Sequence, residues 1–285
     1  MENLYFLSIA IVTRNRSQSL YRALKSISEQ TISGLEILVS DDSNLESEIM
    51  KNKMICNEFG ARYFTGPKRG LYANRNFIAS LCLGTHIRTM DDDHHLPFGH
   101  LKLCMNAILQ EPNTIWVIGE QMYTNGILLN DFSIPGELTA RGFSLPPAKI
   151  ENYYGISCGG TIYPSSIFKN GIYNCEFFQF GYSYLEFGAR LKYFGYLIKP
   201  LEDTWFIHYS DLTYGSDVHK FEINRSRLFA MISLSFRYQP NFRNIYLTLF
   251  QIFFDLLFIR VTLIDLFQVL KHYHNFNYKL NRVVD

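Results

Sequence analysis

Three consecutive carboxylates, Asp91, Asp92 and Asp93, directly follow a short apolar run and are the side chains best suited to chemistry. Adjacent acids repel one another, so packing alone rarely selects them. A hard divalent cation relieves the repulsion, because Mg²⁺ and Mn²⁺ prefer oxygen ligands and fill their remaining positions with phosphate and water. Since alternate side chains of an extended segment share one side, we expect Asp91 and Asp93 to face a ligand. The triplet therefore predicts a metal and phosphate site.

The alternative is an acidic turn with His94 and His95 as hydrated neighbours, and the surrounding elements decide between the two. The pattern predicts strands over 7–12, 37–39, 61–64, 86–90 and 115–119, and helices from Ser17, over 74–83 and over 97–110. Strand–helix–strand units build a parallel sheet by right-handed crossovers. Acids end two of these strands, at Asp41 and Asp91. Because the carboxyl ends of such strands form the ligand crevice, the metal site is favoured.

Beyond residue 120 the periodicity is weaker. Asn125-Gly126 is typical of a hairpin turn. A strand is expected over 157–163, where Gly159-Gly160 suits a close approach of backbone to a ligand. The pattern then predicts a helix over 185–194, closed by Gly195, and a last strand over 205–208.

The segment from 244 to 272 is mostly Leu, Ile, Phe and Val, but charges interrupt every long apolar run, so a spanning helix is not expected. Read as a helix, it carries one narrow polar stripe on an apolar surface. The stripe is formed by Asn244, Thr248, Gln251, Asp255, Thr262 and Asp265. Two interpretations remain open: packing within the protein, or contact with a membrane surface or a second copy of the chain.

The composition excludes several classes of protein. The net charge of +1, from 27 basic and 26 acidic residues, offers no basic surface for nucleic acid. Five scattered cysteines without a C-x-x-C pair predict neither a disulfide framework nor a zinc site, and favour a reducing compartment. They are Cys56, Cys82, Cys104, Cys158 and Cys175. With no secretory signal visible, we expect a cytoplasmic protein, either free or peripheral on the inner face of the cytoplasmic membrane.

The order of several motifs resembles family-2 glycosyltransferases with the GT-A fold, over roughly residues 5 to 210. The motifs are Ser8-Ile-Ala-Ile-Val-Thr-Arg-Asn-Arg16, Ser28-Glu-Gln-Thr31, Glu36-Ile-Leu-Val-Ser-Asp-Asp-Ser43, Gly66-Pro67, Gly70-Leu-Tyr-Ala-Asn-Arg-Asn76, Met90-Asp-Asp-Asp93, Gly159-Gly160 and Phe187-Gly-Ala-Arg-Leu-Lys-Tyr-Phe-Gly-Tyr196. The resemblance implies an α/β fold with a mixed, mostly parallel sheet. We expect a GT-A domain over 1–215, with a nucleotide-sugar half (1–120) and an acceptor half (121–215). A helical extension over 216–285 would follow it.

The resemblance also implies roles for single residues. The donor-binding residues would be Thr13, Asn15, Asp41, Arg75, Asp91 and Asp92, with Thr13 and Asp41 at the base and ribose. The metal ligands, around Mn²⁺ or Mg²⁺, would be Asp93, Asp91 and His208. Lys68 and Arg69 are further cations that could neutralise phosphate.

The sequence departs from the family at the general base. The family places Glu-Asp just before the helix with the Arg-Leu pair, and alignment on Arg190 puts Ser183 and Tyr184 there. Neither is a competent base near neutral pH. Glu186 is the nearest acid and our candidate base, although two residues along a helix turn it to another side. Glu176 and Asp217 are alternatives.

The function expected from these motifs is metal-dependent, inverting transfer of a sugar from a UDP- or dTDP-linked donor to a glycan or lipid-linked acceptor. A second hypothesis is a catalytically weakened GT-A module that binds nucleotide-sugar or a partner, motivated by the lost Glu-Asp pair. A third, a nucleotidyltransferase, lacks the glycine-rich, lysine-bearing loop that this class carries near its N-terminus.

Overall fold

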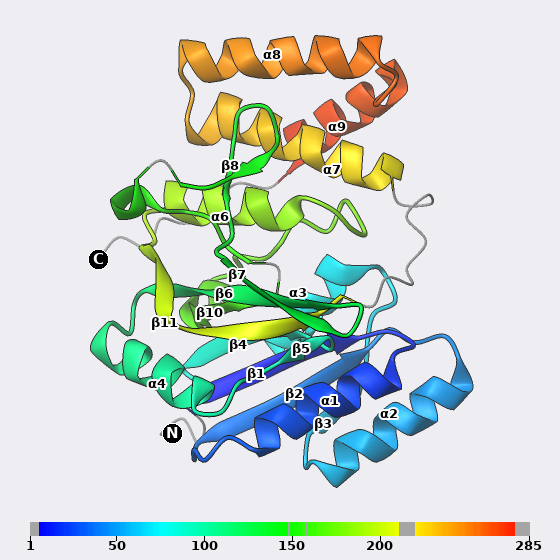
Figure 1. Ribbon diagram of the computed structural model, residues 1–285. Coiled ribbons are helices and arrows are strands. Elements are labelled where there is room, and N and C mark those ends of the chain that lie inside the picture. Colours follow the sequence, from blue (N-terminus) through cyan, green and yellow to red (C-terminus); the bar gives the residue numbers. More distant parts are fainter. Residues whose placement is uncertain (1–5, 148, 158, 211–219, 277–285) are drawn as a thin grey trace.

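A mixed sheet of nine strands runs through the centre of the computed structural model, which describes residues 6–147, 149–157, 159–210 and 220–276 (Figure 1). The strand order is β3-β2-β1-β4-β10-β6-β11-β5, with β7 beside β6. The strands are β1 (Leu7–Thr13), β2 (Leu35–Asp41), β3 (Arg62–Thr65), β4 (His86–Asp91), β5 (His94–His95), β6 (Ile115–Thr124), β7 (Ile127–Ser133), β10 (Thr161–Pro164) and β11 (Ile198–Tyr209). A separate pair is formed by β8 (Glu137–Leu138) and β9 (Ser144–Leu145).

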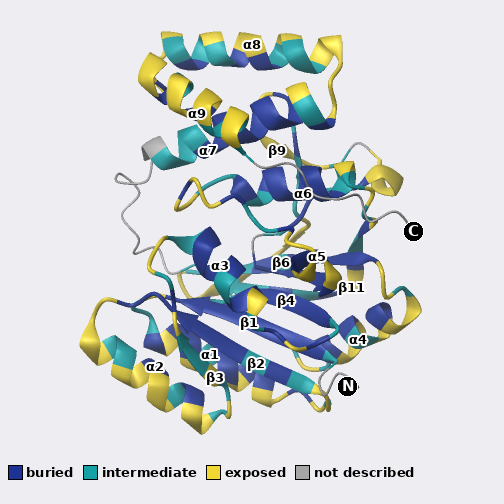
Figure 2. Ribbon diagram, turned by 180° about the vertical axis from the view of Figure 1, so that it is seen from behind, coloured by how far each residue is buried: buried dark blue, intermediate teal, exposed yellow. Residues whose placement is uncertain are grey.

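Helices cover both faces of this sheet. They are α1 (Ser17–Ser28), α2 (Glu46–Glu58), α3 (Leu71–Ser80), α4 (His100–Gln110), α5 (Ser166–Lys169), α6 (Ser183–Tyr193), α7 (Lys220–Ser233), α8 (Phe242–Leu257) and α9 (Leu263–Asn275), with a 3₁₀ turn η1 (Ile150–Asn152) and a π-helical turn η2 (Leu234–Tyr238). The alternation of β1 divides the core: Ile9 and Ile11 pack with α1 and α4, whereas Ala10 and Val12 pack with α3, α5 and α6. Figure 2 shows the resulting buried centre of the sheet.

The first half of the sheet is parallel, as the sequence predicts. β1 pairs with β2 and β4, and β2 pairs with β3, all in parallel register. Thr13 lies opposite Asp41, and Val12 lies opposite Asp91. The ends of β1, β2 and β4 therefore meet at one edge of the sheet, where the acidic triplet follows β4.

The second half differs in detail from the sequence prediction. β10 runs antiparallel to both β4 and β6, and it is shorter than the expected strand over 157–163. β11 is far longer than the expected strand over 205–208 and pairs with β6 in parallel. The hairpin at Asn125-Gly126 is confirmed, with both residues at positive φ between β6 and β7. Helix α2 was not predicted, because its outward face mixes charged and apolar residues without a clear period.

The C-terminal region is helical, and the segment expected as one helix over 244–272 is two. The chain leaves α8 at Phe258, and α9 begins after Thr262, whose hydroxyl and Asp265 form a reciprocal capping box. A strong helix start inside the apolar stretch explains the break. Within the described ranges, no helix is long and apolar enough to cross a membrane. The described cysteines, Cys56, Cys82, Cys104 and Cys175, are buried and unbridged; Cys158 lies outside the described residues.

Candidate active site at the carboxyl edge of the sheet

Asp91 ends β4 and is held by a cation from α3. Arg75 Nη2 donates to Asp91 Oδ1 at 2.5 Å and to Oδ2 at 2.7 Å, and the Arg75 side chain is 3% exposed. Burial alone would raise the pKa of Asp91, but Arg75 and nearby His94 outweigh it and hold that pKa below its ordinary value. Asp91 and Arg75, both predicted at the donor site, are thus brought together, with the carboxylate already neutralised.

Asp92 points away from the crevice and supports the loop after β1. Its side chain is fully buried. Thr13 Oγ1 donates to Asp92 Oδ2 at 2.6 Å, and Arg16 forms an ion pair with the same carboxylate. Burial raises the pKa of Asp92, and Arg16 opposes that rise. In the structure the side chains of Thr13 and Asp92 bind each other, and their contacts with a donor stay a prediction.

Asp93 turns toward two histidines that arrive on different strands. Asp93 Oδ1 lies 3.7 Å from His94 Nε2 on β5 and 3.8 Å from His208 Nε2 on β11. The three ligand atoms all lie within 4.8 Å of one another. Arg16 Nη1 donates to the other oxygen, Oδ2, at 2.9 Å, while Oδ1 is buried and accepts no hydrogen bond from the described residues. An oxygen and two ring nitrogens thus converge on one point.

Both imidazoles use Nδ1 toward an acceptor, which leaves Nε2 facing Asp93. His94 Nδ1 lies 3.1 Å from the Gly159 carbonyl, and His208 Nδ1 lies 2.9 Å from Glu120 Oε2. Each acceptor requires a proton on Nδ1, so the lone pair of a neutral ring sits on Nε2. Burial lowers the pKa of His94 to about 4. Burial also acts to lower the pKa of His208, but Glu120 and Asp93 raise it to about 9. Near neutral pH, a bound cation would have to displace the proton on His208 Nε2, because the pKa of this ring is raised.

These three side chains fit a divalent cation on their own chemistry. A carboxylate with two imidazoles is a donor set for first-row divalent metals, and each ring has the outer acceptor that metal-bound histidines usually have. Asp91, predicted as a second ligand, is not one of this group, because Arg75 occupies both of its oxygens. His94 was missed as a ligand; its place directly after Asp93 was the only signal, and its partner Gly159 is distant in sequence.

Gly159 packs against His94 and Asp91, and Gly160 packs against Phe206, so the close approach of backbone observed here is to side chains. A Cβ on Gly159 would lie 2.7 Å from His94 Cε1 and 2.8 Å from Asp91 Oδ2. A Cβ on Gly160 would lie within 2.3 Å of the Phe206 ring. The backbone there approaches the side chains of the site itself, so larger residues would displace the histidine and the acid.

Asp41 ends β2 but already has a full set of partners. Its Oδ1 accepts from the Ser43 amide at 2.8 Å, and its Oδ2 accepts from Asn52 Nδ2 and Tyr63 Oη, both at 2.9 Å. It is 1% exposed. Asp41 therefore shapes the β2 loop, and a nucleotide contact would require it to give up one of these bonds.

Asn15 joins the loops after β1 and β2. At a φ of 54°, its Oδ1 accepts from the Asn44 and Leu45 amides and its own amide donates to Ser43 Oγ. The side chain that was predicted to bind donor is thus part of the crevice wall.

Asp42 is a neighbour that the sequence prediction passed over. Its Oδ1 accepts from the Lys68 amide at 2.9 Å, and burial raises its pKa. A Cβ on Gly66 would fall 2.2 Å from this oxygen, so Asp42 requires glycine in the Gly66-Pro67 loop. Asp42 thereby links the β2 end to the loop that bears Lys68 and Arg69.

Glu186 lies in the interior, and its environment argues against a role as general base. It is 0% exposed. Arg190 Nε donates to its Oε1 at 2.9 Å, and the Tyr238 hydroxyl from η2 donates to the same oxygen. A base needs a lone pair that a substrate proton can reach. We therefore withdraw Glu186 as the base and assign it to the packing of α6. Ser183 is also buried, whereas Tyr184 is half-buried.

Of the two alternative bases, Glu176 and Asp217, the structure describes only Glu176. Glu176 is one-third exposed, accepts from Asn76 Nδ2 at 2.8 Å, and pairs with Arg69 at 3.2 Å. It is bound to α3 through Asn76, the residue that follows Arg75 in sequence. Asp217 lies outside the described residues.

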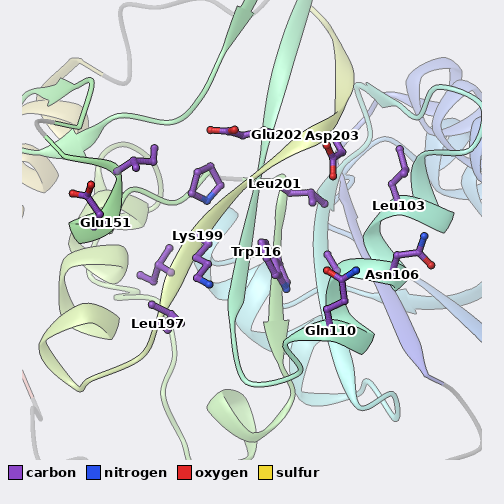
Figure 3. Close-up of a pocket in the computed structure, with 14 residues that line it drawn as sticks. Leu103, Asn106, Gln110, Trp116, Glu151, Leu197, Lys199, Leu201, Glu202 and Asp203 are labelled. Carbon is purple, nitrogen blue, oxygen red and sulfur yellow. The ribbon is translucent and has the colours of Figure 1, made fainter.

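A cavity among the described residues lies away from these strand ends. It has a volume of about 570 Å³ between α4, η1 and β11, and its wall includes Trp116, Asn106, Gln110, Lys199 and Asp203 (Figure 3). None of the predicted site residues lines it. Geometry at the strand ends, and not cavity size, therefore marks the candidate active site.

Comparison with known proteins agrees with this placement. The sequence model of glycosyl transferase family 2 matches residues 8–171, which include β1 to β4 and the acidic triplet. The chain belongs to glycosyltransferase family 2.

The relatives of this family-2 chain include a chondroitin synthase and a glucosyltransferase. The chain is 26% identical over 140 residues to chondroitin synthase of Pasteurella multocida, covering 49% of this chain and 14% of the relative. It is 27% identical over 183 residues to GalNAc(5)-diNAcBac-PP-undecaprenol beta-1,3-glucosyltransferase of Campylobacter jejuni. That match covers 60% of this chain and 56% of the relative. The chain thus spans only part of each relative's length.

Solved structures show that the fold is GT-A, as the resemblance implied. S. aureus TarS 1-349 in complex with UDP-GlcNAc superposes with a TM-score of 0.60 at 16% identity, over 93% of this chain and 79% of that one. The structure of GalNAc-T7 with UDP, GalNAc and Mn²⁺ superposes with a TM-score of 0.65 at 16% identity, over 84% of this chain and 50% of that one.

Proposed function

We propose that this family-2 chain transfers a sugar, with inversion, from a UDP- or dTDP-linked donor to a glycan or lipid-linked acceptor in polysaccharide synthesis. The observation that carries the proposal is the convergence of Asp93, His94 and His208 at the carboxyl edge of the sheet. UDP is the preferred donor nucleotide, because the TarS and GalNAc-T7 structures were determined with UDP or UDP-GlcNAc.

A divalent cation is part of the proposal, held by Asp93 Oδ1 and the Nε2 atoms of His94 and His208. Two imidazoles favour Mn²⁺ over Mg²⁺, which prefers oxygen ligands, and the GalNAc-T7 structure contains Mn²⁺. When bound, such an ion supplies positive charge to the leaving diphosphate. The chain's own contribution is to hold Asp93 Oδ2 through Arg16 and to orient both rings through Gly159 and Glu120.

In the proposed reaction an acceptor hydroxyl attacks the anomeric carbon while the bond from that carbon to the diphosphate oxygen breaks. Inversion follows, because the hydroxyl enters opposite the leaving group. The hydroxyl proton must go to a base. With Glu186 buried and paired, Glu176 is the remaining described candidate, since it is partly exposed and is bonded to Asn76 of α3, the residue after Arg75.

We also propose that the protein works at the inner face of the cytoplasmic membrane. Support comes from the Campylobacter relative, whose name describes an acceptor joined through -PP- to undecaprenol. The near-neutral charge gives no reason to expect a nucleic-acid partner.

A thermal-shift screen of nucleoside diphosphates with and without Mn²⁺ tests the proposal. Selective binding raises the melting temperature by mass action, so UDP with Mn²⁺ should give a larger rise than UDP alone and than ADP or GDP. Absence of a rise with every nucleotide tested would remove the donor assignment.

The second candidate is a weakened GT-A module, favoured by the absence of an acid at Ser183 and Tyr184. Calorimetry with UDP and Mn²⁺ beside a turnover assay separates the two. Tight binding with no product from lipid-linked and free glycan acceptors would favour this module over the transferase.

A further inference from the structure

The outer surface of α8 and α9 is apolar, whereas the polar residues of α8 point inward. Thr248, Gln251 and Asp255 are each 0% exposed. The exposed apolar residues are Phe242, Tyr246, Leu249, Phe250, Phe253, Leu257, Phe258, Ile259, Leu263, Ile264, Phe267 and Leu270. In Figures 1 and 2 these helices form the end of the molecule farthest from α1 and α2, with exposed residues along their outer side. This polarity is the reverse of an ordinary surface helix.

The inward polar residues fix the helix in this orientation. Arg227 of α7 forms a buried ion pair with Asp255 at 2.5 Å, and Gln251 Nε2 donates to the other Asp255 oxygen at 2.9 Å. Thr248 Oγ1 donates to the Ala140 carbonyl at 2.7 Å. Rotating α8 to hide its aromatic residues would leave Arg227 buried without its partner, which is costly. The apolar surface is therefore built into the fold.

The exposed charges of α8, α9 and the turn between them have one sign. The acids of α8 and α9 are Asp255 and Asp265, and both are turned inward, the second toward Thr262 and Arg225. The exposed charged residues of 242–276 are all basic: Arg243, Arg260 and Lys271. A surface of exposed aromatic and aliphatic side chains edged by cations complements anionic lipid headgroups over an acyl layer.

We propose that the outer surface of α8 and α9 lies flat in the interface of an anionic membrane, with its apolar side chains among the acyl chains. Neither helix spans: α8 has 16 residues, about 24 Å along its axis, and lies across the end of the molecule. A second copy of the chain fits less well. A two-fold contact would gather the basic residues of both copies, with no acid on this surface to neutralise them.

This inference deepens the proposed membrane setting by naming the surface that meets lipid, and in that respect it rests on the proposed function. α7 connects this layer to α6: the Tyr182 amide donates to Ser226 Oγ at 2.9 Å, and the Gln179 amide to Glu222 at 3.0 Å. The segment before α6, where the family has its base, thus lies between the membrane surface and the sheet. An acceptor held in lipid would approach from this side.

Vesicle flotation of the full chain tests the inference, with phosphatidylcholine vesicles that contain or lack phosphatidylglycerol. The wild type should float with the anionic vesicles. Phe253→Glu with Phe267→Glu should reduce partitioning at least about tenfold, because each removes a buried aromatic ring from the acyl layer. Arg243→Ser with Lys271→Ser should weaken binding to anionic vesicles by about fivefold for each cation, and leave neutral vesicles unaffected.

Matched controls are Met54→Glu on α2 and Phe98→Glu before α4, equally exposed apolar residues on other surfaces, which should float like the wild type. UDP binding by calorimetry and the melting temperature, measured on every variant, separate this result from the donor site and from misfolding. Failure of the wild type to float while UDP still binds would overturn the inference and the proposed membrane setting, and leave the proposed sugar transfer intact. A dimer in light scattering that the Phe253 and Phe267 changes dissociate, without vesicle binding, would overturn it in favour of a second copy.

Discussion

Asp93 differs from its two neighbours in having an oxygen that no described side chain occupies. Asp91 is neutralised by Arg75 and Asp92 is enclosed with Thr13, so a cation can be held only through Asp93 Oδ1. Asp93→Ala should therefore abolish the Mn²⁺-dependent part of the UDP-induced rise in melting temperature. At a hundredfold excess over Kd that rise corresponds to about 2.7 kcal/mol, or several degrees for a chain of this size.

The fold should survive this change, because Asp93 gives up an ion pair with the partly exposed Arg16 and the longer contacts, at 3.7 and 3.8 Å, with His94 and His208. Asp131→Ala on the exposed strand β7 is the matched control and should keep the full rise. An unaltered metal-dependent rise in the Asp93 variant would show that the cation binds elsewhere or not at all.

How far the sequence could predict the site depends on where each partner comes from. Asp93 was proposed because the acidic triplet follows an apolar strand, and strand ends meet at one edge. His208 was proposed from the family resemblance alone. The saturation of Asp41 was not foreseeable, since Asn52 lies on α2, a helix with no clear periodicity, and Tyr63 lies on β3. The burial of Glu186 could not be predicted, because spacing along a helix shows toward which side a residue points but not what covers that side. Its partner Tyr238 lies 52 residues away in sequence.

The segment before β10 contains Gly159, whose backbone sets the geometry of the proposed metal ligands. A Cβ on Gly159 would contact His94 and Asp91 well inside van der Waals distance, and its φ lies outside the left-handed region, so alanine is excluded by crowding alone. Gly159→Ala should lower Mn²⁺ affinity at least about tenfold, since changes around metal-bound histidines commonly cost that much. Isothermal calorimetry with Mn²⁺ and UDP measures it.

Gly84→Ala is the matched control for this element. Gly84 is similarly crowded, with a Cβ position 2.7 Å from Ser8 Oγ, but it lies before the opposite end of β4. The Gly84→Ala protein should lose stability while keeping the Mn²⁺ affinity of the wild type. If both variants bind Mn²⁺ like the wild type, the backbone approach at Gly159 does not position the ligands.

Helix α6 is held to η2 by the buried carboxylate of Glu186. Glu186→Gln leaves the Arg190 guanidinium without its countercharge, and removal of one partner from a buried pair costs about 3–5 kcal/mol. Urea unfolding should show this loss, with the midpoint falling and the slope retained. Tyr238→Phe, which removes one hydrogen bond to the same charged oxygen, should cost about 1.5–3 kcal/mol. Unchanged stability with lost turnover would instead restore Glu186 as the general base.

The parallel half of the sheet was predictable because β1, β2 and β4 are short apolar runs between clear turn residues. The antiparallel insertion of β10 between β4 and β6 was not predictable, because the sequence does not show with which strands a later strand pairs. The same limit applies to the whole molecule. The division at residue 215 followed the end of the family resemblance, but α7 packs directly on the GT-A domain.

Two core clusters cross that division. Leu228 and Phe229 of α7, both fully buried, pack with Cys175 and Phe178, and Ala230 packs with Leu185 and Ala189 of α6. A chain ending at 215 would expose these partners to water, together with the carboxylate of Glu186 that Tyr238 binds. We therefore expect residues 1–215 to aggregate or to unfold without cooperativity, because the helical region belongs to the same folding unit.

The comparison chain for this last prediction ends at residue 276 and keeps every described helix. It should match the full chain in soluble yield, in melting temperature and in UDP affinity. Size-exclusion chromatography with circular dichroism distinguishes the outcomes. A monomeric 1–215 fragment that unfolds in one transition and binds UDP with unchanged affinity would show that the GT-A domain is independent. In that case α7 to α9 would be an attachment to the enzyme and not part of its core.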